Sequence, residues 1–212
     1  DGWGIACYQN GIPQVMRKAT AAFADAHFSE TAEGIHARAV VAHVRLASVG
    51  NVADVNAHPF TYGCWTFAHN GGLPAFERMK SQLEIETDAA LQSQRLGTTD
   101  SEHIFLWLLS RLKRSGIALD RPCENVNAAA EVVARAVRDL AQRNDQLSVT
   151  EPARLNFILT DGANLLATRW HNSLYWVERD GIRDCEVCGV PHVDHSDHTN
   201  YRAVVVASEP IS

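Results

Sequence analysis

The sequence has no apolar run approaching the roughly 18 residues that a membrane-spanning helix needs, and it does not begin with a basic and then apolar signal segment. Positive charge is also scarce, because 19 Lys and Arg stand against 25 Asp and Glu, a formal net charge of −6. No basic face is therefore expected for nucleic acid or for an anionic membrane surface. These absences favour a cytoplasmic protein that binds a small polar molecule.

Cysteines are few and odd in number, which argues against the disulfide framework of a small secreted protein. Reduced thiols are expected. Cys7 lies inside a predicted strand and Cys64 stands directly before Trp65, so both are expected to be buried packing residues. The five cysteines are Cys7, Cys64, Cys123, Cys185 and Cys188.

The chain also lacks internal repeats, low-complexity tracts and Gly/Pro/Ser linkers. Its 212 residues, 46% hydrophobic and 21% charged, are enough for one large core. It has no initiator methionine and opens on Asp1-Gly2-Trp3-Gly4, which runs directly into a predicted strand. We therefore expect residues 1–212 to form a single domain that lacks its N-terminal segment.

Strand signals occur at both ends of the chain. Asn10-Gly11 suits the positive φ angles of a hairpin turn, residues 38–46 are apolar on both faces as in a central strand, and a strand is expected to end at His69, before paired glycines. Strands are predicted at residues 4–8, 12–17, 38–46, 64–68, 155–160, 165–170, 174–177 and 201–207.

Three helices are predicted in the middle of the chain. Apolar residues recur at helical spacing over 73–83 and over 125–143. Between them, Thr99-Asp100-Ser101-Glu102 has the pattern of a capping box, with a threonine N-cap and a glutamate three residues later. Strands, then helices, then strands again indicate a layered α+β fold.

Three short motifs lie at the ends of these elements and contain residues suited to chemistry. Arg45 ends an apolar strand, where a buried guanidinium needs an anionic partner such as a carboxylate. Asp100 lies in the first turn of a helix, and Asn70-Gly71 offers an amide and a backbone N–H, the donors that stabilise an oxyanion. Taken singly, Arg45 is consistent with an interior ion pair, Asp100 with a helix-start residue and Asn70-Gly71 with a turn. Together they suggest acyl transfer.

These motifs, with Asp1-Gly2-Trp3-Gly4 before them and residues 56–60 between the first two, resemble the class II glutamine amidotransferase domain of the N-terminal-nucleophile hydrolases. The resemblance covers roughly the first half of the chain well, and residues 206–210 are similar too. Within the family, the pattern is most similar to free-standing members, which include the γ-glutamyl hydrolase of ergothioneine synthesis and the amidotransferase-like subunit of glutathione degradation. The implied fold is a four-layer αββα sandwich.

The resemblance also implies how the head group of a glutamyl substrate would be bound. Arg45 would bind the α-carboxylate, assisted by Ser48 and by the backbone near Val49. Asp100 would hold the α-ammonium. No metal or organic cofactor is implied.

The same resemblance implies an oxyanion hole made by the Asn70 side chain and the Gly71 N–H. Arg45 and Asp100 would together form a head-group clamp. His58 would support the loop between this clamp and the oxyanion hole, although a structural hydrogen-bonding role explains it equally well. The nucleophile of the family is an N-terminal cysteine whose own α-amine is the general base. We expect that cysteine a few dozen residues before Asp1, so residues 1–212 alone would be inactive.

The implied reaction is hydrolysis of a glutamine or γ-glutamyl amide through a cysteinyl thioester, and a synthase or peptidase subunit is a candidate partner. Two alternatives stay open. One is a catalytically inactive pseudoenzyme or regulatory subunit that retains the clamp and only binds γ-glutamyl compounds or amino acids. The other concerns the loop 185–200, which is either a solvated histidine-rich excursion or a zinc site. Its candidate ligands are Cys185, Cys188, His192, His195 and His198.

Overall fold

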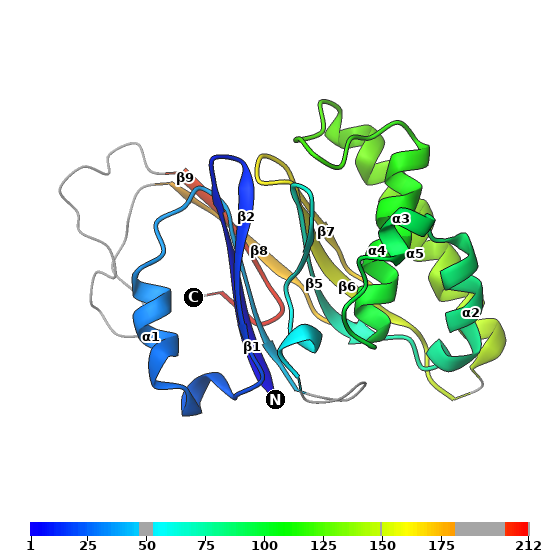
Figure 1. Cartoon of the computed structure of the whole chain (residues 1–212), viewed down its shortest axis with the longest axis horizontal. Helices are drawn as coiled ribbons and strands as arrows, with labels where there is room; N and C mark the ends of the chain where they lie inside the picture. The colour runs from blue at the N-terminus through cyan, green and yellow to red at the C-terminus, as the bar shows by residue number, and fades with distance from the viewer. Residues whose placement is uncertain (47–52, 149, 181–201, 212) are drawn as a thin grey trace. The chain divides into compact units, whose positions relative to one another are not determined.

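The structure is a computed structural model that describes residues 1–46, 53–148, 150–180 and 202–211 (Figure 1). Ser48 and Val49 lie outside the described residues, as does the whole of the candidate zinc loop. The chain divides into two compact units, residues 1–171 and 172–212. The fold is mixed α/β with antiparallel sheets.

The first sheet contains the predicted hairpin. Strands β1 (Gly2–Gln9) and β2 (Ile12–Lys18) pair antiparallel across a turn in which Asn10 and Gly11 have φ angles of 52° and 79°. Strand β3 (Val40–Arg45) pairs with the other side of β1, giving the order β2-β1-β3. The prediction that 38–46 is a central strand was wrong, because β1 holds the centre of the described sheet. An apolar strand indicates burial, but its alternate residues Val40 and Val44 are 45% and 67% exposed.

The second sheet has the order β4-β5-β6-β7. It is formed by β4 (Phe60–Tyr62), β5 (Trp65–Gly72), β6 (Arg154–Thr160) and β7 (Leu165–Thr168).

Strand β5 continues past the point where the sequence predicted its end. Asn70 pairs with Asn156 and Gly72 with Arg154, so both glycines belong to the β5–β6 ladder. Gly71 is needed there, because an added Cβ would lie 2.0 Å from the Arg154 carbonyl oxygen. The paired glycines thus permit a close approach of two strands and do not terminate β5.

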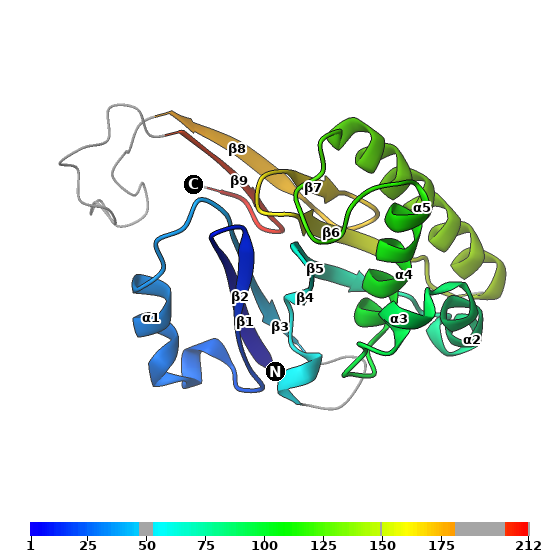
Figure 2. The same ribbon diagram turned by 45° about the horizontal axis from the view of Figure 1, so that its top comes forward.

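The two sheets of the first unit face each other through small residues, and Figure 2 shows them side by side. Ala6 and Val41 of the first sheet form a buried cluster with Ala68 of the second. The Tyr8 hydroxyl also crosses between them, 2.8 Å from the Thr66 hydroxyl. This contact fixes the end of the first sheet that is remote from Arg45.

Helices cover the other face of the second sheet (Figure 1). Three match the predicted ones: α2 (Phe76–Glu86), α4 (Asp100–Arg114) and α5 (Val126–Leu147). Most of α4 is buried, and its Phe105 ring stacks on Phe67 of β5 at 5.3 Å. Two further helices escaped prediction, because α1 (Ala26–Glu33) buries no residue and α3 (Ala89–Gln92) is a single turn; short 3-10 turns occur at 22–24 and 54–56.

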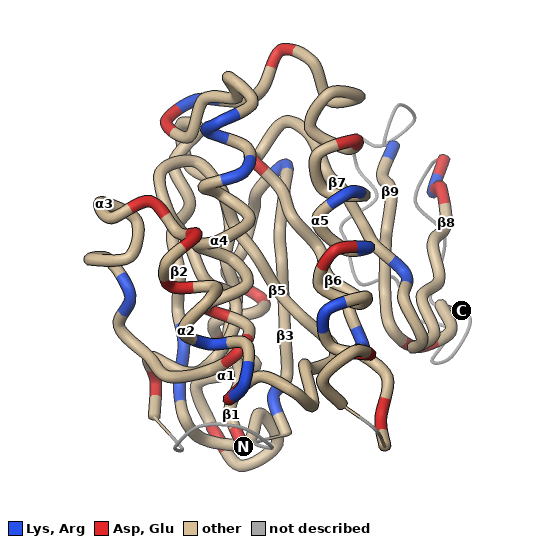
Figure 3. Tube along the Cα trace, turned by 90° about the vertical axis from the view of Figure 1, so that its right-hand side faces the viewer, with Lys and Arg blue, Asp and Glu red and all other residues tan. Residues whose placement is uncertain are grey.

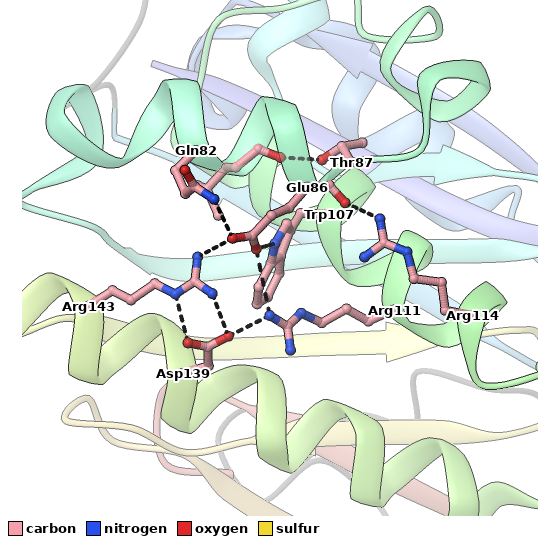
Figure 4. A network of polar contacts seen from close by, with 9 residues as sticks. Gln82, Glu86, Thr87, Trp107, Arg111, Arg114, Asp139 and Arg143 are labelled. Atoms are coloured by element: carbon pink, nitrogen blue, oxygen red, sulfur yellow. Dashed lines mark hydrogen bonds and ion pairs between the residues drawn. The ribbon is translucent and has the colours of Figure 1, made fainter.

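A polar network ties α2, α4 and α5 together at Glu86 (Figure 4). Its carboxylate accepts hydrogen bonds of 2.8 Å each from Gln82, Trp107 and Arg143. Burial raises the pKa of Glu86, but these three bonds outweigh that effect and lower the pKa to about 2. Arg111 lies over the Trp107 ring at 3.9 Å. The helical layer is therefore cross-linked by charge-assisted bonds as well as by its apolar core.

Helix α4 begins where the sequence predicts. The Thr99 hydroxyl accepts from the Glu102 N–H at 3.2 Å, which confirms the N-cap. The Glu102 carboxylate does not return to Thr99 as a capping box would require. It accepts instead from the backbone N–H groups of Leu96 and Gly97, at 3.0 and 2.7 Å. Through these two hydrogen bonds, Glu102 holds the loop residues Leu96 and Gly97 that lead into α4.

Thr99→Ala is expected to lower the free energy of unfolding by about 1 kcal/mol, because the first turn of α4 loses its side-chain acceptor. Thr99→Ser retains the hydroxyl and should remain close to the wild type. Chemical denaturation of both variants measures the difference. Equal stability of the alanine and serine variants would contradict the cap.

The second unit contains strands β8 (Tyr175–Asp180) and β9 (Arg202–Ala207), which pair antiparallel with Trp176 opposite Val206. Both strands were predicted. Across the described part of both units, every helix is too short or too polar to cross a bilayer.

Candidate active site

The three predicted motifs converge in the first unit. Arg45 is the last residue of β3, opposite Gly2 of β1, and is 8% exposed. Asp100 begins α4 and is 4% exposed, whereas Asn70 near the end of β5 is exposed. Burial lowers the pKa of Arg45, and the nearby charge of Asp100 opposes that shift. The guanidinium and the carboxylate are therefore close enough to interact electrostatically.

The Asp100 carboxylate joins the start of α4 to the segment that follows β5. Its Oδ1 accepts from the Ser101 N–H at 2.7 Å and its Oδ2 accepts from the Leu73 N–H at 2.9 Å. A Cβ added to Gly72 would lie 3.4 Å from Oδ2. Asp100 is thus both a helix-start residue, as its simplest interpretation had it, and a direct neighbour of Gly72 and Leu73, which follow Asn70-Gly71.

His69 lies between these elements and is a site residue that the sequence motifs did not predict. Its ring is 2% exposed, with Nδ1 3.0 Å from the Ser101 hydroxyl and Nε2 2.8 Å from the Arg154 carbonyl oxygen. Burial lowers the pKa of His69, against the opposing effects of Asp100 and of the bond to Arg154. Strand alternation was the signal available, since it places the His69 side chain on the face opposite Asn70.

Two more histidines lie near Arg45. The rings of His43 and His58 are 4.3 Å apart, and His58 also contacts Phe60 at 4.8 Å. Burial, followed by the charges of His69 and Arg45, lowers the pKa of His43 to about 4, and burial lowers the pKa of His58 well below its ordinary value. Neither ring nitrogen of His58 has a hydrogen-bond partner among the described residues. The ring contacts of His58 therefore join β3 to β4, and the alternative of a hydrogen-bonding role finds no partner among the described residues.

The described cysteines near the sheets are packing residues, as expected. Cys7 and Cys64 are buried, and burial raises the pKa of Cys64 to about 12. A thiol with so high a pKa is protonated at neutral pH and is a poor nucleophile.

Two cavities beside the helices are lined by residues other than those of the three motifs. One of about 460 Å³ lies beside Arg138 and Trp170, and one of about 370 Å³ lies beside Met79 and Leu147. Neither cavity has Arg45, Asn70 or Asp100 in its lining. The convergence of those three motifs, not cavity size, marks the candidate site.

Comparison with known proteins places this arrangement in a family. The family model described as class II glutamine amidotransferases matches residues 1–212. The chain is 30% identical to the probable glutamine amidotransferase DUG3 of Saccharomyces cerevisiae, over 100% of this chain and 64% of that protein. It is 28% identical to the gamma-glutamyl-hercynylcysteine sulfoxide hydrolase of Mycobacterium tuberculosis, over 86% of this chain and 64% of that protein.

A solved structure agrees. The glutamine aminotransferase class-II domain protein of Silicibacter pomeroyi is 25% identical and superposes with a TM-score of 0.64, covering 82% of this chain and 74% of that one. The chain spans 64% of the length of each of the two curated relatives above. Because the family model matches from the first residue to the last, and a relative at 30% identity aligns over the whole chain, the protein belongs to the class II glutamine amidotransferases.

Proposed function

We propose that the full-length protein hydrolyses the side-chain amide of glutamine or of a γ-glutamyl compound through a cysteinyl thioester. The observation that carries this proposal is the convergence of Arg45 and Asp100 on the end of the strand that bears Asn70 and Gly71. The four-layer αββα arrangement, a single amidotransferase domain over 1–212 and a cytoplasmic location are parts of the same proposal.

In this proposal the substrate head group is held by two opposite charges. The Arg45 guanidinium would donate to the α-carboxylate as a fork, with Ser48 and the backbone at Val49 assisting. Asp100 would accept from the α-ammonium. Each carboxylate oxygen has two lone-pair sites, so Asp100 retains accepting capacity beside its bonds to the Ser101 and Leu73 backbone.

The reacting carbonyl would face Asn70 and Gly71. The thiolate of an N-terminal cysteine upstream of Asp1 adds to the amide carbon, and the cysteine's α-amine takes the thiol proton. The Asn70 amide and the Gly71 N–H stabilise the oxyanion. The C–N bond then breaks as the amine leaves with that proton, and water hydrolyses the thioester to a γ-carboxylate and the free thiol. His58 would support this region through its ring contacts.

The proposal is tested by expressing the protein with its natural N-terminus and measuring release of ammonia or amine from glutamine and from γ-glutamyl compounds. Release that is lost when the N-terminal cysteine is replaced by alanine is the expected result. Binding of these compounds without release by the unaltered protein would establish the binding-only alternative and refute the hydrolase.

Arg45→Lys is expected to raise KM for glutamine by roughly tenfold to a hundredfold, because lysine keeps the charge but loses the two-donor fork. The fold should survive, since the change retains a cation at the end of β3. Arg38→Lys, at an exposed position shortly before the same strand, is the matched control and should leave KM unchanged. An unaltered KM in the Arg45 variant would contradict the clamp.

A further inference from the structure

The Ser101 hydroxyl stands between two groups that compete for its single proton. Its oxygen lies 3.0 Å from His69 Nδ1 and 3.2 Å from Asp100 Oδ1. Both Ser101 and His69 are almost completely buried. A hydroxyl has one donor, so in a given state it can donate to the histidine or to the aspartate but not fully to both.

The other side of His69 decides between these two arrangements. Its Nε2 lies 2.8 Å from the Arg154 carbonyl, which can only accept, so Nε2 carries a proton in the neutral and in the charged ring. When His69 is neutral, Nδ1 accepts the Ser101 hydroxyl proton. When His69 is protonated, Nδ1 donates to the Ser101 oxygen, and the hydroxyl must turn its proton to Asp100 Oδ1.

We infer that His69 and Ser101 are positioning residues for Asp100. While His69 is neutral, they leave the remaining acceptor site of Asp100 Oδ1 open to a substrate ammonium. When His69 is protonated, the Ser101 hydroxyl occupies that site. The inference rests on the proposed role of Asp100 in binding the head group. His69 and Ser101 act through Asp100 and are not required to touch the reacting amide.

The surroundings of His69 favour the open arrangement at neutral pH. Asp100 of α4 faces the ring with a negative charge, while His43 of β3 and His58 before β4 lie near enough to interact with it and contribute positive charge when protonated. Burial is the largest influence and lowers the pKa of His69, so the neutral ring is favoured near neutral pH and acidification favours the protonated ring.

The test measures binding of L-glutamate, the product head group, by calorimetry with the full-length protein between pH 7 and pH 5. The α-carboxylate and α-ammonium of the ligand keep their charges over this range. The wild-type Kd is expected to rise about tenfold on acidification. Ser101→Ala should remove most of that rise, and Ser101→Thr, which keeps the hydroxyl, should restore it.

Two replacements of His69 sharpen the test. His69→Asn places an amide near the former Nδ1, so it can still contact Ser101 but cannot be protonated. Its Kd should therefore be almost independent of pH. His69→Gln places its amide near the former Nε2 and retains the bond to Arg154, so it reports how much of any loss comes from the strand contact alone. Thermal unfolding of each variant checks that the fold is intact.

Full acid dependence in folded Ser101→Ala or His69→Asn, or a wild-type Kd that is constant over this range, would overturn the inference while leaving the proposed function in place. Failure of the wild type to bind glutamate or glutamine at pH 7 would instead refute the proposed function and, with it, this inference.

Discussion

Asn70→Ala is expected to lower kcat by about a hundredfold or more with little change in KM, because an oxyanion donor acts mainly on the tetrahedral state and not on the bound amide. Asn70 is exposed at the end of β5 and pairs in register with Asn156, so its truncation should leave the strand in place. Steady-state kinetics of the full-length protein with glutamine measure both parameters.

Asn70→Asp is a sharper companion to this variant. It preserves the shape of the side chain but replaces the amide donor by a carboxylate, which accepts hydrogen bonds and repels a developing oxyanion. It should therefore be at least as slow as the alanine variant. Thr61→Ala, at an exposed position of the neighbouring strand β4, should be fully active. A wild-type kcat in either Asn70 variant would remove this residue from the mechanism.

Mild acid is expected to destabilise the fold through the histidines around Arg45. The folded-state pKa values of His43, His58 and His69 all lie below 6.5, so the unfolded chain binds more protons and stability falls as the pH is lowered through this range. For His43, a change from 6.5 to about 4 corresponds to about 3 kcal/mol lost by pH 4. His58 and His69 add to the loss in the same direction.

Urea unfolding at pH 7.5 and at pH 4.5 measures this effect as a drop in the midpoint. His43→Gln should reduce the dependence on pH, whereas the same change at the exposed His36 should not. The pH range of this histidine effect differs from that of the Glu86 network. A carboxylate with its pKa lowered to about 2 loses its contribution to stability only as the pH falls below about 4.5. A midpoint that does not change between the two pH values would contradict the burial of these rings.

Local signals in the sequence predicted the elements that depend on local physics. Asn10-Gly11 sets a hairpin through its own backbone angles, and the Thr99 hydroxyl caps a helix through a bond only three residues away. The position of β3 in its sheet could not be predicted in this way, because the apolar pattern of a strand does not reveal which strands flank it. Helix α1 was not predicted, because it buries no residue and its sequence therefore has no apolar stripe.

The residues of the candidate site likewise differ in whether a local sequence signal reveals them. Arg45, Asn70 and Asp100 could be selected from short motifs because each stands at the end of an element, where side chains from separate segments meet. The contacts of His69 could not, because they join β5 to α4 and to Arg154, a residue 85 positions away in the sequence. Only the register between β5 and β6 brings that carbonyl to the ring.

The narrow crossing at Gly71 limits how this protein can be redesigned. Any side chain introduced there would meet the Arg154 carbonyl, so the backbone beside Asn70 offers no freedom for adjusting the shape of a bound molecule. An engineer who wants a different amide accepted would have to keep this glycine, and would have to change residues outside both this crossing and the head-group clamp of Arg45 and Asp100.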